Sequence, residues 1–148
     1  PDLIPTGEAL PVDGTPFDFR VATPIDARLR EAHPQLLAGR GYDHHLVLDD
    51  PGPGLRFAAM LHDPASGRAM ALHTTAPGLQ FYSGNFLDGR PVGHGRRTLR
   101  QGDGVCLETQ LAPDAANRPH TADGQACLLR PGAVWRSCTE HRFLVLPP

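Results

Sequence analysis

Three segments of this 148-residue chain carry polar side chains where a β-strand would otherwise be apolar. They are GYDHH at 41–45, PGLQFY at 77–82 and VCLETQ at 105–110. In the third segment, the two-residue period of a strand places Cys106, Glu108 and Gln110 on one face. Apolar neighbours disfavour the charged form of a carboxyl, which would suit Glu108 to proton transfer near neutral pH. The same spacing also fits an exposed Glu on a half-buried strand, and spacing alone favours that second interpretation.

Short apolar stretches are expected to form the strands that position these side chains. Gly and Pro occur 16 times each and are spread along the chain, a composition typical of many short strands joined by turns. The segment DPASG at 63–67 predicts a turn, so that the strands before and after it form a hairpin. Strands are expected at 46–48, 55–61, 68–75, 79–82, 105–110 and 141–146. The predicted fold class is therefore all-β, a sandwich or barrel.

At most one short helix is expected. Residues 23–37 fit it, because Thr23 can cap its N-terminus and Pro24 suits the first helical position. Pro34 would then end or kink the helix, since proline has no backbone N–H to donate. Residues 1–20, which are rich in Pro and Gly, predict an extended lead-in.

The charge and cysteine content disfavour several classes of protein. The 14 basic and 16 acidic side chains are interspersed and give a net charge of -2, so the chain offers no continuous positive surface to a nucleic acid. No apolar run approaches the length of a membrane span, about 18 residues. Cys106, Cys127 and Cys138 form no CxxC pair, which predicts reduced thiols and a cytoplasmic location. A zinc site made from these cysteines and His141 fits no common ligand spacing.

The polar segments belong to longer blocks of sequence. In chain order, these blocks are LIPTGEALPVDGTPFDFR, GYDHHLVLD, HDPASGRAMALHTTAPGLQFYSGNFLDG, GVCLETQLAPDAANRP and LLRPGAVWRSCTEHRF. They cover essentially the whole chain and resemble the consecutive signature blocks of the aldose 1-epimerase (galactose mutarotase) family. The resemblance implies a large antiparallel β-sandwich, of which residues 1–148 are the C-terminal portion of one domain. It also implies an isomerase that interconverts the α and β anomers of free aldohexoses such as glucose or galactose, with no metal or cofactor.

The resemblance assigns roles to individual residues. Glu108 in LETQ matches the family's general base, Asp43 in GYDH matches a carboxylate that hydrogen-bonds sugar hydroxyls, and Gln80 in PGLQFY matches a further sugar contact. Asn85 fits either a turn residue or a ligand contact. Structural roles are expected for His44 and His45, and for Asp114 and Asn117 in the loop after the strand of Glu108.

The family's catalytic acid has no counterpart in this sequence. Family members are roughly twice as long, and their N-terminal half supplies two histidines, one of which is the acid. We therefore expect two partners, a monosaccharide substrate and the N-terminal half of the same enzyme. Without that half, the chain should expose sheet edges or apolar patches. Neither a nucleic acid nor a membrane is an expected partner.

Two alternatives stay open. One is a hexose-6-phosphate 1-epimerase on the same fold, for which Arg96, Arg97 and Arg100 could bind the phosphate. The LETQ and GYDH blocks, however, look more like the branch of the family that acts on unphosphorylated sugars. The other alternative is a non-catalytic carbohydrate-binding or assembly module. The joint presence of Glu108, Asp43 and Gln80 argues against a decayed site.

Overall fold

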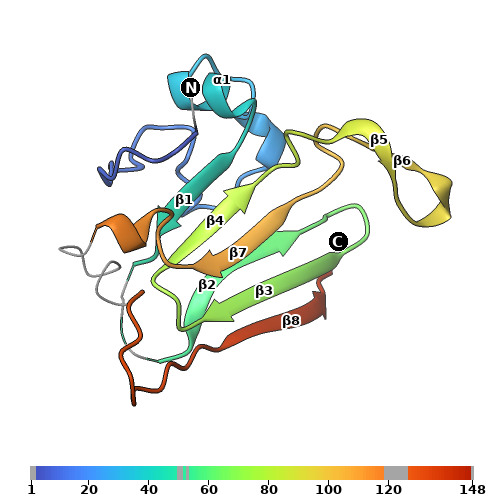
Figure 1. The fold of residues 1–148 in the computed structure, drawn as a ribbon. Helices are drawn as coiled ribbons and strands as arrows, with labels where there is room; N and C mark the ends of the chain where they lie inside the picture. Colours follow the sequence, from blue (N-terminus) through green and yellow to red (C-terminus); the bar gives the residue numbers. More distant parts are fainter. Residues whose placement is uncertain (1–2, 50–51, 53, 119–126, 148) are drawn as a thin grey trace. The chain divides into compact units, whose positions relative to one another are not determined.

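β-Strands dominate the structure, a computed structural model that describes residues 3–49, 52, 54–118 and 127–147 (Figure 1). These residues also include one α-helix of six residues and three short 3₁₀ turns. The prediction of an all-β fold with at most one short helix is confirmed. No helix in this part of the chain is long and apolar enough to cross a bilayer. The strands are β1 (Asp43–Val47), β2 (Arg56–His62), β3 (Arg68–Thr74), β4 (Gly78–Tyr82), β5 (Asp88–Val92), β6 (Thr98–Arg100), β7 (Cys106–Gln110) and β8 (Thr139–Val145).

The chain divides into two compact units, each built from two separate stretches of sequence. The first unit comprises Pro1–His45 with Gln80–Glu108, and the second comprises Leu46–Leu79 with Thr109–Pro148. Each unit therefore depends on contacts between residues that are far apart in the sequence.

An aromatic cluster forms the core of the first unit. The Tyr42 side chain is fully buried and its ring stacks on that of Phe81 at a centroid distance of 4.9 Å. Phe19 meets both rings edge-on, at 5.2 and 5.3 Å, a geometry that stabilises aromatic pairs beyond the area they bury. The Tyr42 hydroxyl donates to the Pro16 carbonyl over 3.1 Å. The lead-in, predicted only as an extended stretch, therefore supplies part of this core.

The helix lies later in the chain than predicted. Residues Ile25–Ala27 form a 3₁₀ turn with no side-chain cap, and the α-helix α1 is Pro34–Gly39. Pro34 begins this helix instead of ending one, because the first helical turn needs no N–H from its residues. The cap is His33, whose Nδ1 accepts a backbone N–H of the first turn over 3.3 Å. The prediction of a single helix over 23–37 was therefore wrong.

Strands β1, β4 and β7 form a three-stranded sheet in that order, with β1 at one edge. Tyr42 directly precedes β1 and Ser83 directly follows β4. The Ser83 N–H donates to the Tyr42 carbonyl over 3.0 Å. Successive side chains of a strand point to opposite faces. Because Phe81 belongs to the aromatic core, its neighbour Gln80 lies on the other face of the sheet. This sheet carries all three side chains to which the sequence assigned a site.

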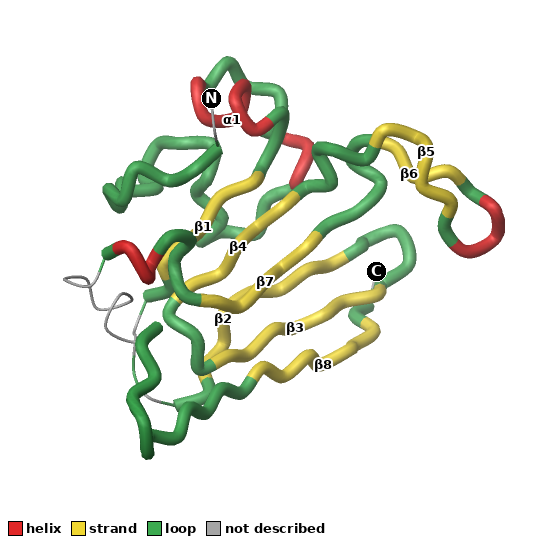
Figure 2. Tube along the Cα trace, in the orientation of Figure 1, coloured by secondary structure: helices red, strands yellow, loops and turns green. Residues whose placement is uncertain are grey.

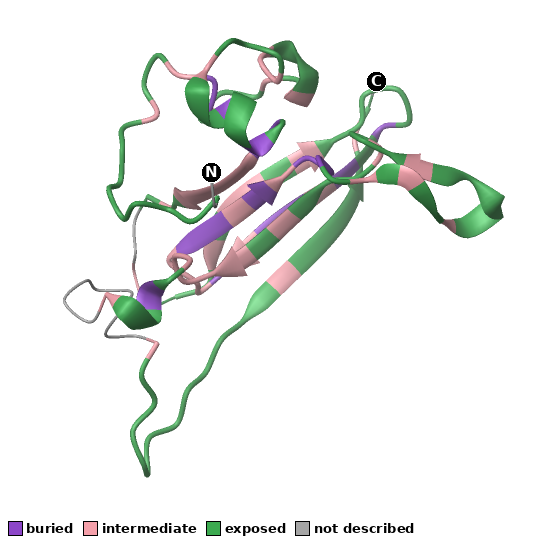
Figure 3. Cartoon of the chain, turned by 45° about the horizontal axis from the view of Figure 1, so that its top comes forward, coloured by how far each residue is buried: buried purple, intermediate pink, exposed green. Residues whose placement is uncertain are grey.

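The second unit contains an antiparallel sheet in the order β2–β3–β8. The β2–β3 hairpin was predicted, and Asp63 closes its turn by accepting the Ala65 N–H over 3.1 Å and the Ser66 hydroxyl. Gly67 follows with a φ of +70°, where an added Cβ would lie 2.7 Å from the Leu146 carbonyl oxygen. Strand β8 pairs with β3 only, and it is exposed along nearly its whole length in the part of the chain that is described (Figure 3).

Strands β5 and β6 form a two-stranded ribbon that the sequence did not predict (Figure 2). Its register pairs Asp88 with Arg100 and Val92 with Thr98. The β5 sequence, Asp-Gly-Arg-Pro-Val, contains three residue types that are depleted in strands. Without apolar alternation, these residues carried no strand signal.

Candidate functional site

A hydrogen bond joins two of the three predicted site residues. Asp43 is the first residue of β1 and Gln80 lies in the middle of β4, and the Gln80 Nε2 donates to Asp43 Oδ1 over 2.8 Å. Both residues are half-buried. The other amide atom, Gln80 Oε1, is buried and has no hydrogen-bond partner among the described residues. A carboxylate and an amide held in this way can donate to and accept from hydroxyl groups.

A buried polar network holds the backbone immediately before Asp43. The Asn85 amide donates to the carbonyls of Gly39 and Tyr42 over 2.8 and 2.9 Å, and its Oδ1 accepts the Ser83 hydroxyl over 2.6 Å. The same hydroxyl oxygen accepts the Tyr42 N–H over 3.0 Å. Both ends of the Asn85 side chain are thus used within the protein. Of the two roles predicted for Asn85, the structure supports the structural one.

Gly41 lets this network form. It has a φ of +139°, and a Cβ added there would lie 2.8 Å from Ser83 Oγ and still closer to the Asn85 side chain. Any side chain at this position would displace the two groups that hold the Tyr42 backbone. The glycine in the GYDH block is therefore required by the close approach of β1 to the loop after β4.

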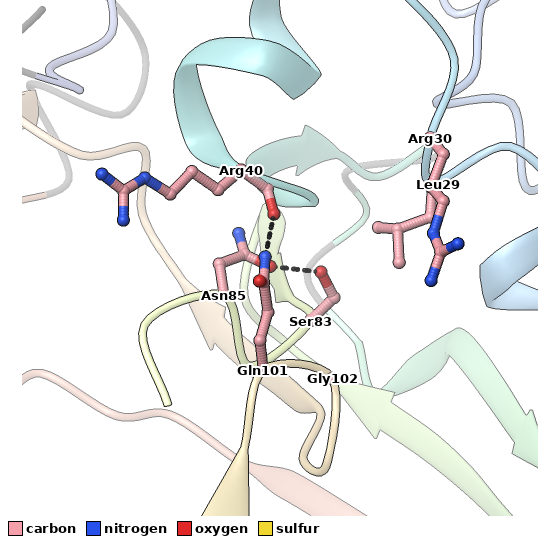
Figure 4. A pocket seen from close by; sticks show the side chains of 7 residues that line it. All are labelled: Leu29, Arg30, Arg40, Ser83, Asn85, Gln101 and Gly102. Atoms are coloured by element: carbon pink, nitrogen blue, oxygen red, sulfur yellow. Dashed lines mark hydrogen bonds between the residues drawn. The ribbon is translucent and has the colours of Figure 1, made fainter. Parts of the chain in front are cut away.

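The network borders a cavity of about 180 Å³ (Figure 4). Gln101 contributes to its wall and donates to the Arg40 carbonyl over 2.9 Å. The guanidinium groups of Arg30 and Arg40 lie on different sides of the view and do not converge. The polar groups that line this cavity hydrogen-bond mainly with one another. We therefore assign the cavity to the structural network that holds the backbone before Asp43, and not to a ligand site. The lining residues are Leu29, Arg30, Arg40, Ser83, Asn85, Gln101 and Gly102.

Glu108, the third predicted site residue, lies in the middle of β7, the strand next to β4. Its side chain is exposed, as are Val105 and Cys106. The apolar surroundings expected from its neighbours in sequence are therefore absent from the described structure. The carboxylate has no hydrogen-bond or ion-pair partner among the described residues, so it is connected to Asp43 and Gln80 only through the sheet. It is exposed to solvent.

His44 contacts the predicted site residue beside it, a feature that sequence reasoning missed. Its Nδ1 accepts the Asp43 backbone N–H over 2.9 Å, and its ring lies 4.4 Å from that of Phe17. Burial lowers the pKa of His44, an effect that Asp43 opposes and His33 reinforces. The ring packing agrees with the structural role expected for this histidine. The only indication of this contact in the sequence was that a histidine directly follows Asp43.

Two other predictions concern the loop after β7. Asn117 donates to the Asp114 carboxylate, and the Arg118 guanidinium lies 3.8 Å from the same carboxylate. Asp114 itself has a φ of +63°. The prediction that Asp114 and Asn117 organise this loop is confirmed. Among the described residues, no group of three or more His, Cys, Asp or Glu side chains is placed to hold a metal ion.

Comparison with known proteins identifies the family. The sequence model of the family described as "Aldose 1-epimerase" matches residues 1–142. The chain belongs to this family. It is 41% identical over 143 residues to the galactose mutarotase of Homo sapiens, and 38% identical over 133 residues to the aldose 1-epimerase of Escherichia coli.

The chain is much shorter than its epimerase relatives. The alignment with the human galactose mutarotase covers 97% of this chain and 39% of the relative, and the alignment with the bacterial enzyme covers 90% and 38%. A solved structure of galactose 1-epimerase from Lactobacillus acidophilus NCFM superimposes with a TM-score of 0.73 at 26% identity. It too is matched over 97% of this chain and 39% of its own length.

Proposed function

We propose that this chain is the C-terminal portion of an aldose 1-epimerase that interconverts the anomers of free aldohexoses such as glucose or galactose. The observation that carries the proposal is the Asp43–Gln80 hydrogen bond on the sheet that also presents Glu108. Neutral hydroxyls are bound through hydrogen bonds, for which a carboxylate and an amide are suitable. In this proposal, Asp43 and Gln80 bind sugar hydroxyls and Glu108 acts as the base.

The reaction needs a proton removed and a proton added. Glu108 would remove the proton of the anomeric hydroxyl while an acid protonates the ring oxygen, which opens the ring to an aldehyde. Rotation about the bond next to the aldehyde carbon, followed by closure on its other face, inverts the anomeric carbon. The exposed, unpartnered carboxylate of Glu108 supports this role. General acids and bases contribute about 10²–10⁴-fold each, which is ample for a reaction that also proceeds unaided.

We place the acid on a further polypeptide segment, the N-terminal half of the enzyme. Exposed apolar side chains support a partner of this kind, with Val145 81% exposed and Phe143 78% exposed on β8. Trp135 and Val134, before β8 in sequence, are 66% and 77% exposed. Large apolar side chains exposed on an edge strand are typical of a surface that another polypeptide covers.

A phosphorylated substrate receives less support. Arg97 and Arg100, offered above as phosphate ligands, each lie 3.5 Å from the carboxylate of Asp103. Their charge is thus directed toward an acidic partner on the protein. The unphosphorylated sugar remains the better proposal. The thiols of Cys106 and Cys138 are exposed and free, which accords with a reducing compartment such as the cytoplasm.

Polarimetry of freshly dissolved α-D-glucose and α-D-galactose tests this function. Three samples are compared with buffer: the chain alone, the chain with a separately made N-terminal half, and that mixture with Glu108→Gln. We expect only the unaltered mixture to accelerate mutarotation. Full activity of the chain alone would locate the acid within these 148 residues. Association of the halves without turnover, with sugar binding that survives Glu108→Gln, would favour the carbohydrate-binding module instead.

A further inference from the structure

We propose that His44 is a positioning residue, whose ring nitrogen Nδ1 fixes the backbone of Asp43 and thereby directs the Asp43 carboxylate toward the sugar. This inference rests on the proposed function, because it assumes that Asp43 binds substrate. The contact that carries it is the 2.9 Å hydrogen bond from the Asp43 N–H to His44 Nδ1.

The position of Asp43 at a sheet edge explains why such a contact is needed. Strand β1 has β4 on one side and no strand on the other among the described residues. Every second backbone N–H of an edge strand lacks a partner in the sheet. The backbone of Tyr42 is paired with Ser83 on the β4 side, so the N–H of the next residue, Asp43, points toward the edge. His44 supplies an acceptor there from within its own strand.

The imidazole is itself packed against a buried aromatic ring. Its ring lies 4.4 Å from that of Phe17, which is buried and also meets His33 edge-on at 5.1 Å. Asp43 is then constrained at three points, its N–H by His44, its carboxylate by Gln80, and the preceding residue by the Asn85 network.

This arrangement works only with neutral His44. A neutral imidazole with its proton on Nε2 offers Nδ1 as an acceptor, whereas the charged ring presents N–H groups at both nitrogens. The titratable groups that influence His44 are Asp43 and His33, and burial lowers its pKa below the usual value of 6.5. As the pH falls through that lowered value, Nδ1 gains a proton and turns into a donor facing the donor of Asp43. Sugar affinity should therefore decrease in acid, beyond any effect of the base.

The test uses two replacements that differ in a single property. His44→Phe keeps a ring against Phe17 but has no acceptor, whereas His44→Asn carries Oδ1 at the same number of bonds from the backbone as Nδ1. We measure the D-galactose dissociation constant and the mutarotation KM and kcat of the full chain combined with the N-terminal half. His44→Phe should weaken binding roughly tenfold, equivalent to about 1.4 kcal/mol, with a smaller change in kcat. His44→Asn should restore most of the affinity and remove the decrease in acid.

The outcomes separate this inference from the proposed function. His62→Phe, at an exposed histidine in the second unit, is the matched control and should bind as the unaltered chain does. If Asp43→Ala abolishes binding while His44→Phe does not change it, Asp43 binds sugar and the role of His44 is refuted. If the unaltered mixture binds no galactose, the proposed function fails and this role with it. If His44→Phe does not fold, the His44→Asn variant still tests the inference. An equal decrease of galactose affinity in acid for His44→Asn and the unaltered chain would overturn it.

Discussion

At the scale of single residues, hydrogen bonds within the protein hold Asp43 and the backbone before it. Gln80 donates to Asp43, and Asn85 donates to the backbone that precedes it. Buried polar groups are costly unless they are hydrogen-bonded. A shift of the backbone before β1 would break the hydrogen bonds of Asn85 and Ser83, so these two side chains constrain it. Glu108 differs, since its exposed carboxylate is unpaired in the described structure. The hydrogen-bonded Asp43–Gln80 pair and the unpaired Glu108 on the same sheet support the proposed reaction, in which the sugar is held while protons move.

Replacement of Asn85 should test the buried network. Asn85→Ala removes the donor to the Gly39 and Tyr42 carbonyls and the acceptor of the Ser83 hydroxyl. We expect the free energy of unfolding to fall by about 1–3 kcal/mol, the cost of buried groups left unsatisfied. Urea denaturation with an unchanged m-value would measure it. Asn117→Ala, at an exposed position, is the matched control, and equal losses for the two variants would contradict a special role for Asn85.

At the scale of elements, the sequence predicted those whose signals lie within their own segment. The β2–β3 hairpin was predicted because Asp63 and Gly67 supply the turn within their own segment. The β5–β6 ribbon was missed, since its residues have no apolar alternation and its pairing is seen only in three dimensions. Pro34 misled the helix prediction because the same residue can end a helix or begin one.

The site was predictable to a similar extent. The sequence blocks singled out Asp43, Gln80 and Glu108, and the structure places all three on one sheet. The contact of His44 with the Asp43 backbone could not be predicted, because it depends on β1 lying at a sheet edge. The exposure of Glu108 agrees with the interpretation that spacing alone favoured, an exposed Glu on a half-buried strand. The apolar surroundings suggested by its Val and Leu neighbours are not found, because neighbours in sequence say little about the face on which a strand residue lies.

The end of α1 provides a prediction at this scale. Arg40 caps the helix in the left-handed conformation, with a φ of 57°, which costs a non-glycine residue about 1–2 kcal/mol. Arg40→Gly should therefore raise the free energy of unfolding by about 1 kcal/mol. Ala38→Gly, inside the same helix, should lower it by about 1 kcal/mol. Thermal and urea denaturation of both variants measure the difference, and changes of the same sign would show that the backbone conformation of Arg40 is not strained.

At the scale of the whole chain, large apolar side chains are exposed in a chain whose alignment covers 39% of the human relative. They include Phe143 and Val145 on β8, an edge strand that pairs only with β3 among the described residues. Such an edge can pair with another strand, and its apolar side chains add to the driving force for association. We therefore expect β8 to be the part of the second unit that another polypeptide contacts.

A charge on β8 should reveal this contact. Val145→Glu places a carboxylate opposite Arg68 in the β3–β8 register, so the cross-strand pair is favourable within the sheet while the exposed edge becomes charged. We expect the variant to fold and to associate less with itself and with the N-terminal half, as measured by sedimentation velocity. Val92→Glu, at an apolar residue 63% exposed on β5, is the matched control and should leave association unchanged. If both variants associate as strongly as the unaltered chain, β8 is not the contact surface and the partner must bind elsewhere.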